Sequence, residues 1–279
     1  MPIHDQSYRH WEGVLKTHTF RWWIITREGL RIILRRKLFL LFILGPAAIQ
    51  FFVYGAIVYG IDIYGSLFKL NAINPKFFFD FLERQTFFIA LICVFGGSGL
   101  IADDLKNNAL QLYLSKPLTR LDYLVGKFAI VMLLTAFVTI GPGILLFTEH
   151  AVLSEGSTFI KQQYWLLGSI ILYSLFIMLT TGSLILALSS LTRSSRYAAI
   201  SFIAILIGSP IFSEMLRNIL KLKSAVFISY WQNLGILGRR LFGLSSSHPW
   251  YWAMLIILGV IGFSIWAMNR KVKGVEIVK

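Results

Sequence analysis

The chain has 279 residues, of which 56% are hydrophobic and only 14% are charged. Soluble domains carry about a quarter charged residues, so this composition excludes an ordinary soluble protein and favours a polytopic membrane protein. The single cysteine, Cys93, excludes a disulfide framework and a cysteine-based metal site. The net charge of +14 could favour nucleic acid as a partner, but the basic residues are distributed as in a membrane protein, so we expect no nucleic acid partner.

Residues 1–37 are first polar and then amphipathic. Arginines gather on one side of a helical wheel, and tryptophan, isoleucine and leucine cover the other. The residues that best define the two sides are Arg27, Arg31, Arg35, Trp22 and Trp23. This pattern predicts an amino-terminal helix that lies in the membrane interface.

Six apolar segments follow, at 38–60, 85–102, 128–148, 164–191, 198–212 and 251–269. A transmembrane helix needs about 20 residues, with a usual range of 17–25. We therefore expect an all-α fold with a six-span transmembrane domain over 38–269 and a basic tail over 270–279.

Lysine and arginine counts predict the orientation of these spans. If the amino terminus is inside, the inner segments hold 18 of the 27 lysines and arginines and the outer segments hold 9. This bias predicts that both termini are cytoplasmic. None of the six apolar segments contains a charged side chain, which argues against an ion-coupled secondary transporter.

The polar stretch 101–127 lies between two strongly apolar segments. Within 104–115, Leu105, Ala109 and Leu112 are spaced to share one face of a helix. Pro117 would end that helix, and Thr119 would cap the next one. Either the stretch is a solvated loop, or it docks a soluble partner, with Leu105 and Leu112 as an apolar ridge.

The segment 213–250 does not have the composition of a plain loop, because apolar and basic residues alternate along it. We expect one or two short helices that lie at the outer interface or dip into it. The simplest interpretation is a surface helix held by lipid.

We expect neither a catalytic residue nor a metal site. Gly126-Lys127 lacks the preceding glycine and the following Ser or Thr of a phosphate-binding loop. The segment 96–99, Gly-Gly-Ser-Gly, matches the nucleophile motif of rhomboid intramembrane proteases. A serine nucleophile needs a base within reach, and no histidine lies in the middle of a span. A rhomboid-like protease is therefore the alternative function, and a membrane scaffold without transport is also left open.

The stretch 101–127 resembles the corresponding region of ABC-2 type transporter permeases. That family shows an acidic residue, a small-Thr-Leu step, Leu-Leu-Ser, a proline, an arginine and Gly-Lys. The matching positions are Asp104, Asn108-Ala109-Leu110, Tyr113-Leu114-Ser115, Pro117, Arg120 and Gly126-Lys127. Two departures are Asp in place of the usual Glu and Asn108-Ala109 in place of Gly-Thr.

The resemblance implies a permease subunit that packs with a second permease and is driven by separate ATP-binding subunits, most often as an exporter. It implies that ATP and Mg²⁺ bind the partner, that this chain has no cofactor or ATPase site, and that the protein lies in the cytoplasmic (inner) membrane. It also implies re-entrant helices between spans five and six. The residues expected to couple to the ATPase are Asp104, Leu105, Lys106, Asn108, Leu112, Ser115, Pro117 and Arg120.

Overall fold

The computed structural model describes residues 20–68, 73–109, 118–154 and 157–272, and this part of the chain is helical without strands. Six helical stretches are long and apolar enough to cross a membrane, which confirms the all-α, six-span fold. They are Lys37–Ile63, Pro75–Lys106, Arg120–Leu153, Phe159–Leu191, Ser195–Ile219 and Trp250–Lys271.

Several of these stretches are built from more than one helical element. The first contains α2 (Lys37–Phe39), the π-helical turn η1 (Leu40–Leu44) and α3 (Gly45–Phe68). The second contains α4 (Pro75–Ile92), the π-helical turn η2 (Cys93–Gly97) and α5 (Gly99–Lys106), and the third contains α7 (Arg120–Val138) and α8 (Ile140–Leu153). The others are α9 (Ser157–Leu191), α10 (Ser195–Ile219) and α12 (Trp250–Lys271).

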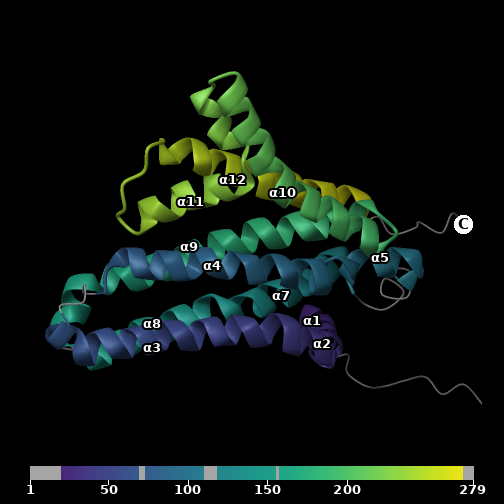
Figure 1. Ribbon diagram of the computed structural model, residues 1–279. Helices are drawn as coiled ribbons and strands as arrows, with labels where there is room; N and C mark the ends of the chain where they lie inside the picture. The colour runs from purple at the N-terminus through teal and green to yellow at the C-terminus, as the bar shows by residue number, and fades with distance from the viewer. Residues whose placement is uncertain (1–19, 69–72, 110–117, 155–156, 273–279) are drawn as a thin grey trace, which may run out of the picture.

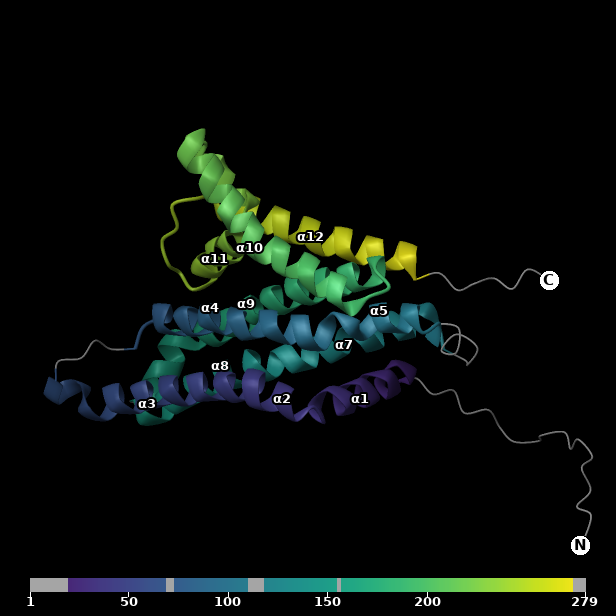
Figure 2. The same cartoon turned by 45° about the vertical axis from the view of Figure 1, so that its right-hand side comes forward.

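The spans form a layered bundle with α9 at its centre (Figure 1). Helix α9 contacts α4, α7, α8, α10 and α12. On one side α3 packs on α8, and on the other side α10, α11 and α12 pack together and against α9 (Figure 1). Helix α1 (Arg21–Leu34), α5 and the end of α12 lie at the same end of the bundle (Figure 2). We call the segment that joins α5 to α7 the elbow, and this end of the bundle the elbow end.

The second span begins earlier than the hydropathy pattern predicts. Asn74 caps α4 by accepting a hydrogen bond from the N–H of Phe77 at 3.1 Å, and Pro75 occupies the first helical position. As a result Asp80, Glu83 and Arg84 lie within the first turns of a spanning helix. The expectation that no span holds a charged side chain is therefore wrong for this helix, although the charges lie near its end.

The segment after α10 folds back into the bundle. It forms the 3₁₀ turn η3 (Lys223–Ile228) and α11 (Tyr230–Leu241), which confirms the two short helices. The N–H of Tyr230 donates to Ser209 Oγ at 3.0 Å, and Ser213 Oγ donates to the carbonyl of Ala225 at 2.8 Å. The earlier residue of α10 pairs with the later residue of the returning segment, so the two segments are antiparallel. The chain therefore returns alongside α10 before α11 begins.

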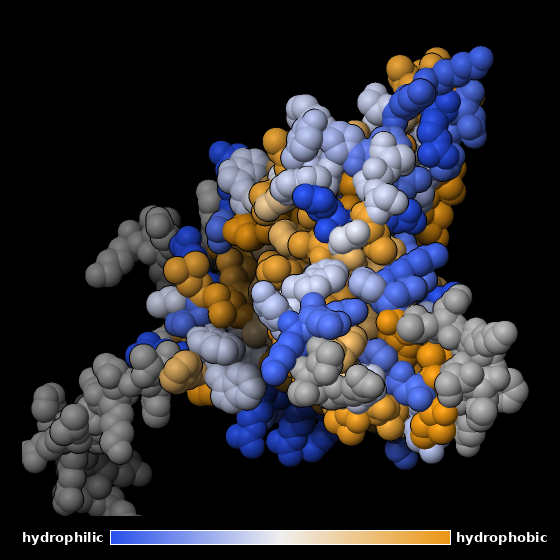
Figure 3. All heavy atoms as spheres, turned by 90° about the vertical axis from the view of Figure 1, so that its left-hand side faces the viewer, coloured by the Kyte–Doolittle hydropathy of each residue, from blue (hydrophilic) through white to orange (hydrophobic). Residues whose placement is uncertain are grey.

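Helix α11 is packed inside the bundle rather than held on its surface. Leu234 and Leu237 are buried, and Gly238 lies against the rings of Tyr173 and Phe79, where a Cβ would come within 2.7 Å of both. The surface-helix interpretation is therefore wrong for α11. The end of the molecule opposite the elbow exposes hydrophobic surface interleaved with hydrophilic side chains (Figure 3).

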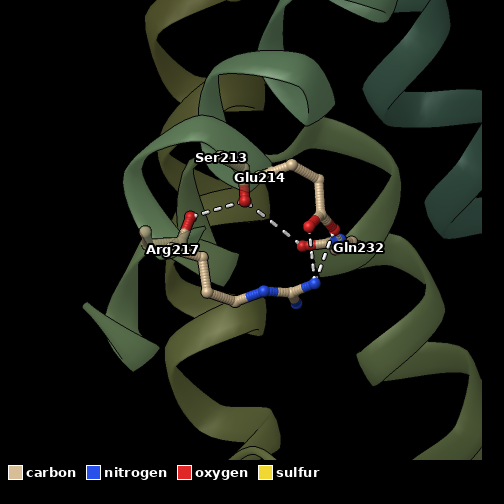
Figure 4. Close-up of polar contacts among 5 residues, drawn as sticks. Ser213, Glu214, Arg217 and Gln232 are labelled. Atoms are coloured by element: carbon tan, nitrogen blue, oxygen red, sulfur yellow. Dashed lines mark hydrogen bonds and ion pairs between the residues drawn. The ribbon is translucent and has the colours of Figure 1, made fainter. Parts of the chain in front are cut away.

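A polar cluster joins α10 to α11 (Figure 4). The guanidinium of Arg217 donates to both oxygens of Glu214, at 2.7 and 2.6 Å. The amide of Gln232 donates to Glu214 Oε1 at 3.4 Å, and Ser213 Oγ lies 3.4 Å from Gln232 Oε1. The contacts of Gln232 link α11 to the span that precedes it, whereas the pair of Arg217 and Glu214 lies within α10.

Candidate functional site: the elbow between α5 and α7

Asp104, Tyr123 and Lys127 meet at the elbow end, and we call them the elbow cluster. Asp104 lies near the end of α5, whereas Tyr123 and Lys127 lie in the first turns of α7. Lys127 Nζ is 2.7 Å from Asp104 Oδ2, and the hydroxyl of Tyr123 donates to the same oxygen at 2.7 Å. One carboxylate oxygen thus joins the two helices that flank the elbow.

The elbow cluster is shielded from solvent. The side chains of Lys127 and Asp104 are 9% and 17% exposed, and Tyr123 is fully buried. The ammonium group also lies 5.5 Å from the centre of the Tyr123 ring, within reach of a cation–π contact. Removing one partner of such a buried pair leaves the other charge uncompensated and costs about 3–5 kcal/mol. The cluster therefore holds the end of α5 against the start of α7.

A capping box fixes the start of α7. Thr119 Oγ1 accepts the N–H of Asp122 at 3.1 Å, and Asp122 Oδ2 accepts the N–H of Thr119 at 3.0 Å. This confirms the predicted Thr119 cap and the role of the residue three positions on. The direction in which the chain enters α7 is thereby set by side chains that lie next to the elbow cluster.

The amino-terminal helix α1 packs directly on α7. Thr26 is fully buried, and its hydroxyl donates to the carbonyl of Gly126 at 3.0 Å. A Cβ at Gly126 would lie 2.9 Å from both Ile25 Cβ and the carbonyl oxygen of Trp22, so only glycine allows this approach. Gly126 and Lys127 are adjacent, so one short segment binds α1 and α5 at the same time.

The predicted helix over 104–115 is interrupted at Asn107 and Asn108, and its residues 110–115 lie outside the described residues. Helix α5 ends at Lys106, the N–H of Asn107 bonds to the carbonyl of Asp103, and Asn108 adopts a left-handed φ of 52°. Asparagine tolerates this conformation better than most residues, and two consecutive asparagines are poor helix formers. The apolar spacing gave no sign of this break, because periodicity does not report a reversal of φ.

The five described coupling residues differ in their exposure. Lys106, Asn108 and Arg120 are exposed at the elbow end, whereas Asp104 is partly buried in its ion pair and Leu105 packs against the core. The other three, Leu112, Ser115 and Pro117, lie outside the described residues.

The interfacial residues of α1 divide between a packed side and an open side. Trp22 is partly buried, whereas Trp23, Arg27, Arg31 and Arg35 are exposed. The side that packs on α7 is carried by Ile25, Thr26 and Ile33, which are buried. Sequence reasoning overlooked Thr26 as a contact, and it also gave no structural role to Tyr123 and Lys127. The paired Gly126-Lys127 was the available signal.

Ser98 does not have the surroundings of a nucleophile. Its hydroxyl donates to the carbonyl of Val94 in its own helix. His150 Nδ1 is 2.7 Å from Asp62, and His248 bonds to Ser246 and Ser247, so both described histidines are engaged elsewhere. The described residues therefore lend the protease alternative no support.

A comparison with family models gives a match over most of the chain. The model described as "ABC-2 family transporter protein" matches residues 22–229, from α1 to the start of α11. No curated protein matches the sequence. The match covers well over half of the chain and includes α5 and α7. The chain therefore belongs to the ABC-2 family of transporter proteins and is a multi-pass membrane permease of that type.

Proposed function

We propose that the chain is the permease subunit of an ATP-binding-cassette exporter and that the elbow receives the force of a separate ATPase. The observation that carries this proposal is the elbow cluster, which ties the end of α5 to the start of α7 through an ion pair shielded from solvent. A connection held in this way moves the two helices together when a partner pushes on it.

The need for a separate ATPase follows from the source of free energy for transport. A transport cycle needs a source of free energy that favours one conformation over the other, and the family as a whole obtains it from ATP. Under this proposal ATP and Mg²⁺ bind the partner subunit, and this chain holds no cofactor. Two permeases would form the path, each seated on an ATP-binding subunit.

The exposed part of the elbow suggests where the partner binds. Lys106, Asn108 and Arg120 are exposed around the connection and can set the register of an ATPase groove. Leu112, Ser115 and Pro117 are proposed contacts on sequence grounds. Asp104 and Leu105 are proposed to hold the connection in place rather than to contact the ATPase.

The elbow end is proposed to be cytoplasmic, with both termini on the same side and the protein in the inner membrane. The basic bias of the inner segments supports this orientation. Arg27, Arg31 and Arg35 on the open side of α1 would then face the anionic lipid headgroups of the cytoplasmic leaflet.

The test is purification of the tagged chain in mild detergent, followed by identification of its partners and transport assays in vesicles. We expect an ATP-binding subunit with a Walker motif to copurify, and ATP hydrolysis to appear only when that subunit is present. If the chain copurifies with no such subunit, and vesicles that contain it move no substrate on addition of ATP, the proposal is wrong.

A further inference from the structure

A cavity of about 440 Å³ lies between α9, α10 and α12, beneath the turn that joins η3 to α11. This volume falls in the range of ligand-binding pockets, about 300–1,000 Å³. The wall is mostly aliphatic. The apolar lining residues include Leu184, Ile205, Ile228, Ile257, Val260 and Phe263.

The cavity lies at the depth of the hydrocarbon core. Trp250, Tyr251 and Trp252 open α12, and aromatic residues of this kind mark the membrane–water interface. The lining residues of α12 run from Ile256 to Ser264. At 1.5 Å per residue they lie about 6–18 Å beyond Trp252 along the helix, which is in the middle part of a core about 30 Å thick.

The polar groups of Thr180, Ser209, Tyr230 and Asn233 already have partners or are sealed off, and Ser264 is the remaining polar residue of the wall. Thr180 Oγ1 donates to the carbonyl of Phe176, and Ser209 Oγ accepts the N–H of Tyr230. The amide nitrogen of Asn233 donates to the carbonyls of Phe227 and Ser229. The hydroxyl of Tyr230 and Oδ1 of Asn233 have no partner, but both atoms are enclosed by protein and do not reach the cavity. The accessible wall thus favours an apolar occupant.

The cavity opens to the exposed surface of the bundle between α10 and α12. Ile205, Ile228 and Phe263 line it, and they are 36%, 44% and 65% exposed. Gly259 also lines it, and a Cβ added there meets no atom within 4 Å. A flexible chain can therefore enter sideways between α10 and α12 without displacing a side chain at Gly259.

We propose that this cavity binds one acyl chain of a membrane lipid. The apolar wall, the hydrocarbon depth and the sideways opening all fit a chain of methylene groups supplied by the surrounding bilayer. Ile228 and Tyr230, at the tip of the returning segment, line the same cavity. The bound chain therefore supports the position of η3 and α11, and lipid composition affects how firmly this segment is held against α10.

The experiment uses the full chain in nanodiscs that contain phosphatidylglycerol with a photoreactive diazirine in the middle of one acyl chain. After illumination, mass spectrometry maps the adducts. We expect adducts within 205–209 and 256–264 that an excess of unmodified phosphatidylglycerol removes. Gly259→Leu should reduce them about tenfold, which corresponds to about 1.4 kcal/mol. Gly259→Ala should give a smaller reduction of the same adducts.

Gly262→Leu is the matched control, because Gly262 lies on the same helix, has equal open space and does not line the cavity. It should leave the adducts unchanged. Equal labelling of the wild type, Gly259→Leu and Gly262→Leu would overturn the proposal. A second copy of the chain is the other possible occupant. If Gly259→Leu lowers the dimer fraction while the adducts persist, the cavity takes a protein helix and the lipid assignment is wrong.

Discussion

The carboxylate of Asp104 and the ammonium group of Lys127 lie 2.7 Å apart, although the whole polar connection separates them in the sequence. Both residues are positions at which the chain resembles other ABC-2 permeases. Their contact gives that resemblance a physical reason, because the acidic residue and the lysine of the Gly-Lys step hold the end of α5 against the start of α7. Under the proposed function, residues that face an ATPase would lie between these two ends.

Removing either member of this pair should lower the stability of the protein. Removing both should lower it by less than the sum of the two single losses. Lys127→Met leaves the partly buried Asp104 carboxylate without its cation, and we expect a loss of about 3 kcal/mol, at the low end for buried pairs. Asp104→Asn should also destabilise. The double variant should recover part of the loss. Thermal unfolding of the purified variants measures this, and purely additive losses would show that the two groups are not coupled.

Gly126→Val should detach α1 from α7. The added side chain would meet Ile25 Cβ and the backbone oxygen of Trp22, and neither can rotate away because both belong to the α1 helix. We expect faster tryptic cleavage after Arg27 and Arg31, which the folded helix protects. The control is Gly168→Val on α9, where a Cβ meets no atom within 4 Å. Unchanged cleavage in the Gly126 variant would contradict the close packing.

The six spans could be predicted because long apolar segments depend only on local composition. Their ends could not be predicted equally well. The start of α4 was missed because Asp80, Glu83 and Arg84 lower the hydropathy of a helix that Asn74 and Pro75 begin. An asparagine followed by a proline was a readable start signal, but hydropathy outweighed it.

The elbow was predicted in part. The Thr119 cap could be read because both of its partners lie within four residues. The break at Asn108 could not be read from apolar spacing, since spacing is unaffected by a single left-handed residue. The contact of Asp104 with Lys127 depends on the fold of two spans, and no local pattern contains it.

Ser189→Ala should destabilise the protein, whereas Ser98→Ala should have little effect. A serine protease with Ser98 as its nucleophile would instead lose its activity in Ser98→Ala. Ser189 Oγ donates to the carbonyl of Ser98 and accepts the N–H groups of Ile101 and Ala102, so its loss removes three hydrogen bonds to buried backbone groups. We expect Ser189→Ala to cost about 1–3 kcal/mol. Ser98→Ala removes only a bond within its own helix and should leave transport intact. Loss of all activity in well-folded Ser98→Ala would revive the protease alternative.

The proposed orientation can be tested with single cysteines, because the native Cys93 is fully buried. A cysteine at Ser247, at the end opposite the elbow, should react with an impermeant thiol reagent on intact cells. A cysteine at Asn107 should react only after the membrane is opened. Both positions are exposed in the structure, so a difference in labelling reports sidedness. Labelling of Asn107 from outside would reverse the orientation.

The coupling proposal predicts that charge reversal at the exposed elbow disturbs the ATPase while the permease still inserts. Lys106→Glu and Arg120→Glu change exposed side chains on the two sides of the connection. Each should weaken ATPase association by at least about 1 kcal/mol, about fivefold in affinity, or separate ATP hydrolysis from transport. Leu112→Asp, chosen on sequence grounds, should do the same. Copurification and ATP-driven transport in vesicles measure both effects. Lys161→Glu reverses an exposed charge at the other end of the bundle and should change neither. If the three elbow variants match Lys161→Glu in both assays, the elbow is an ordinary connection and the ATPase must couple elsewhere.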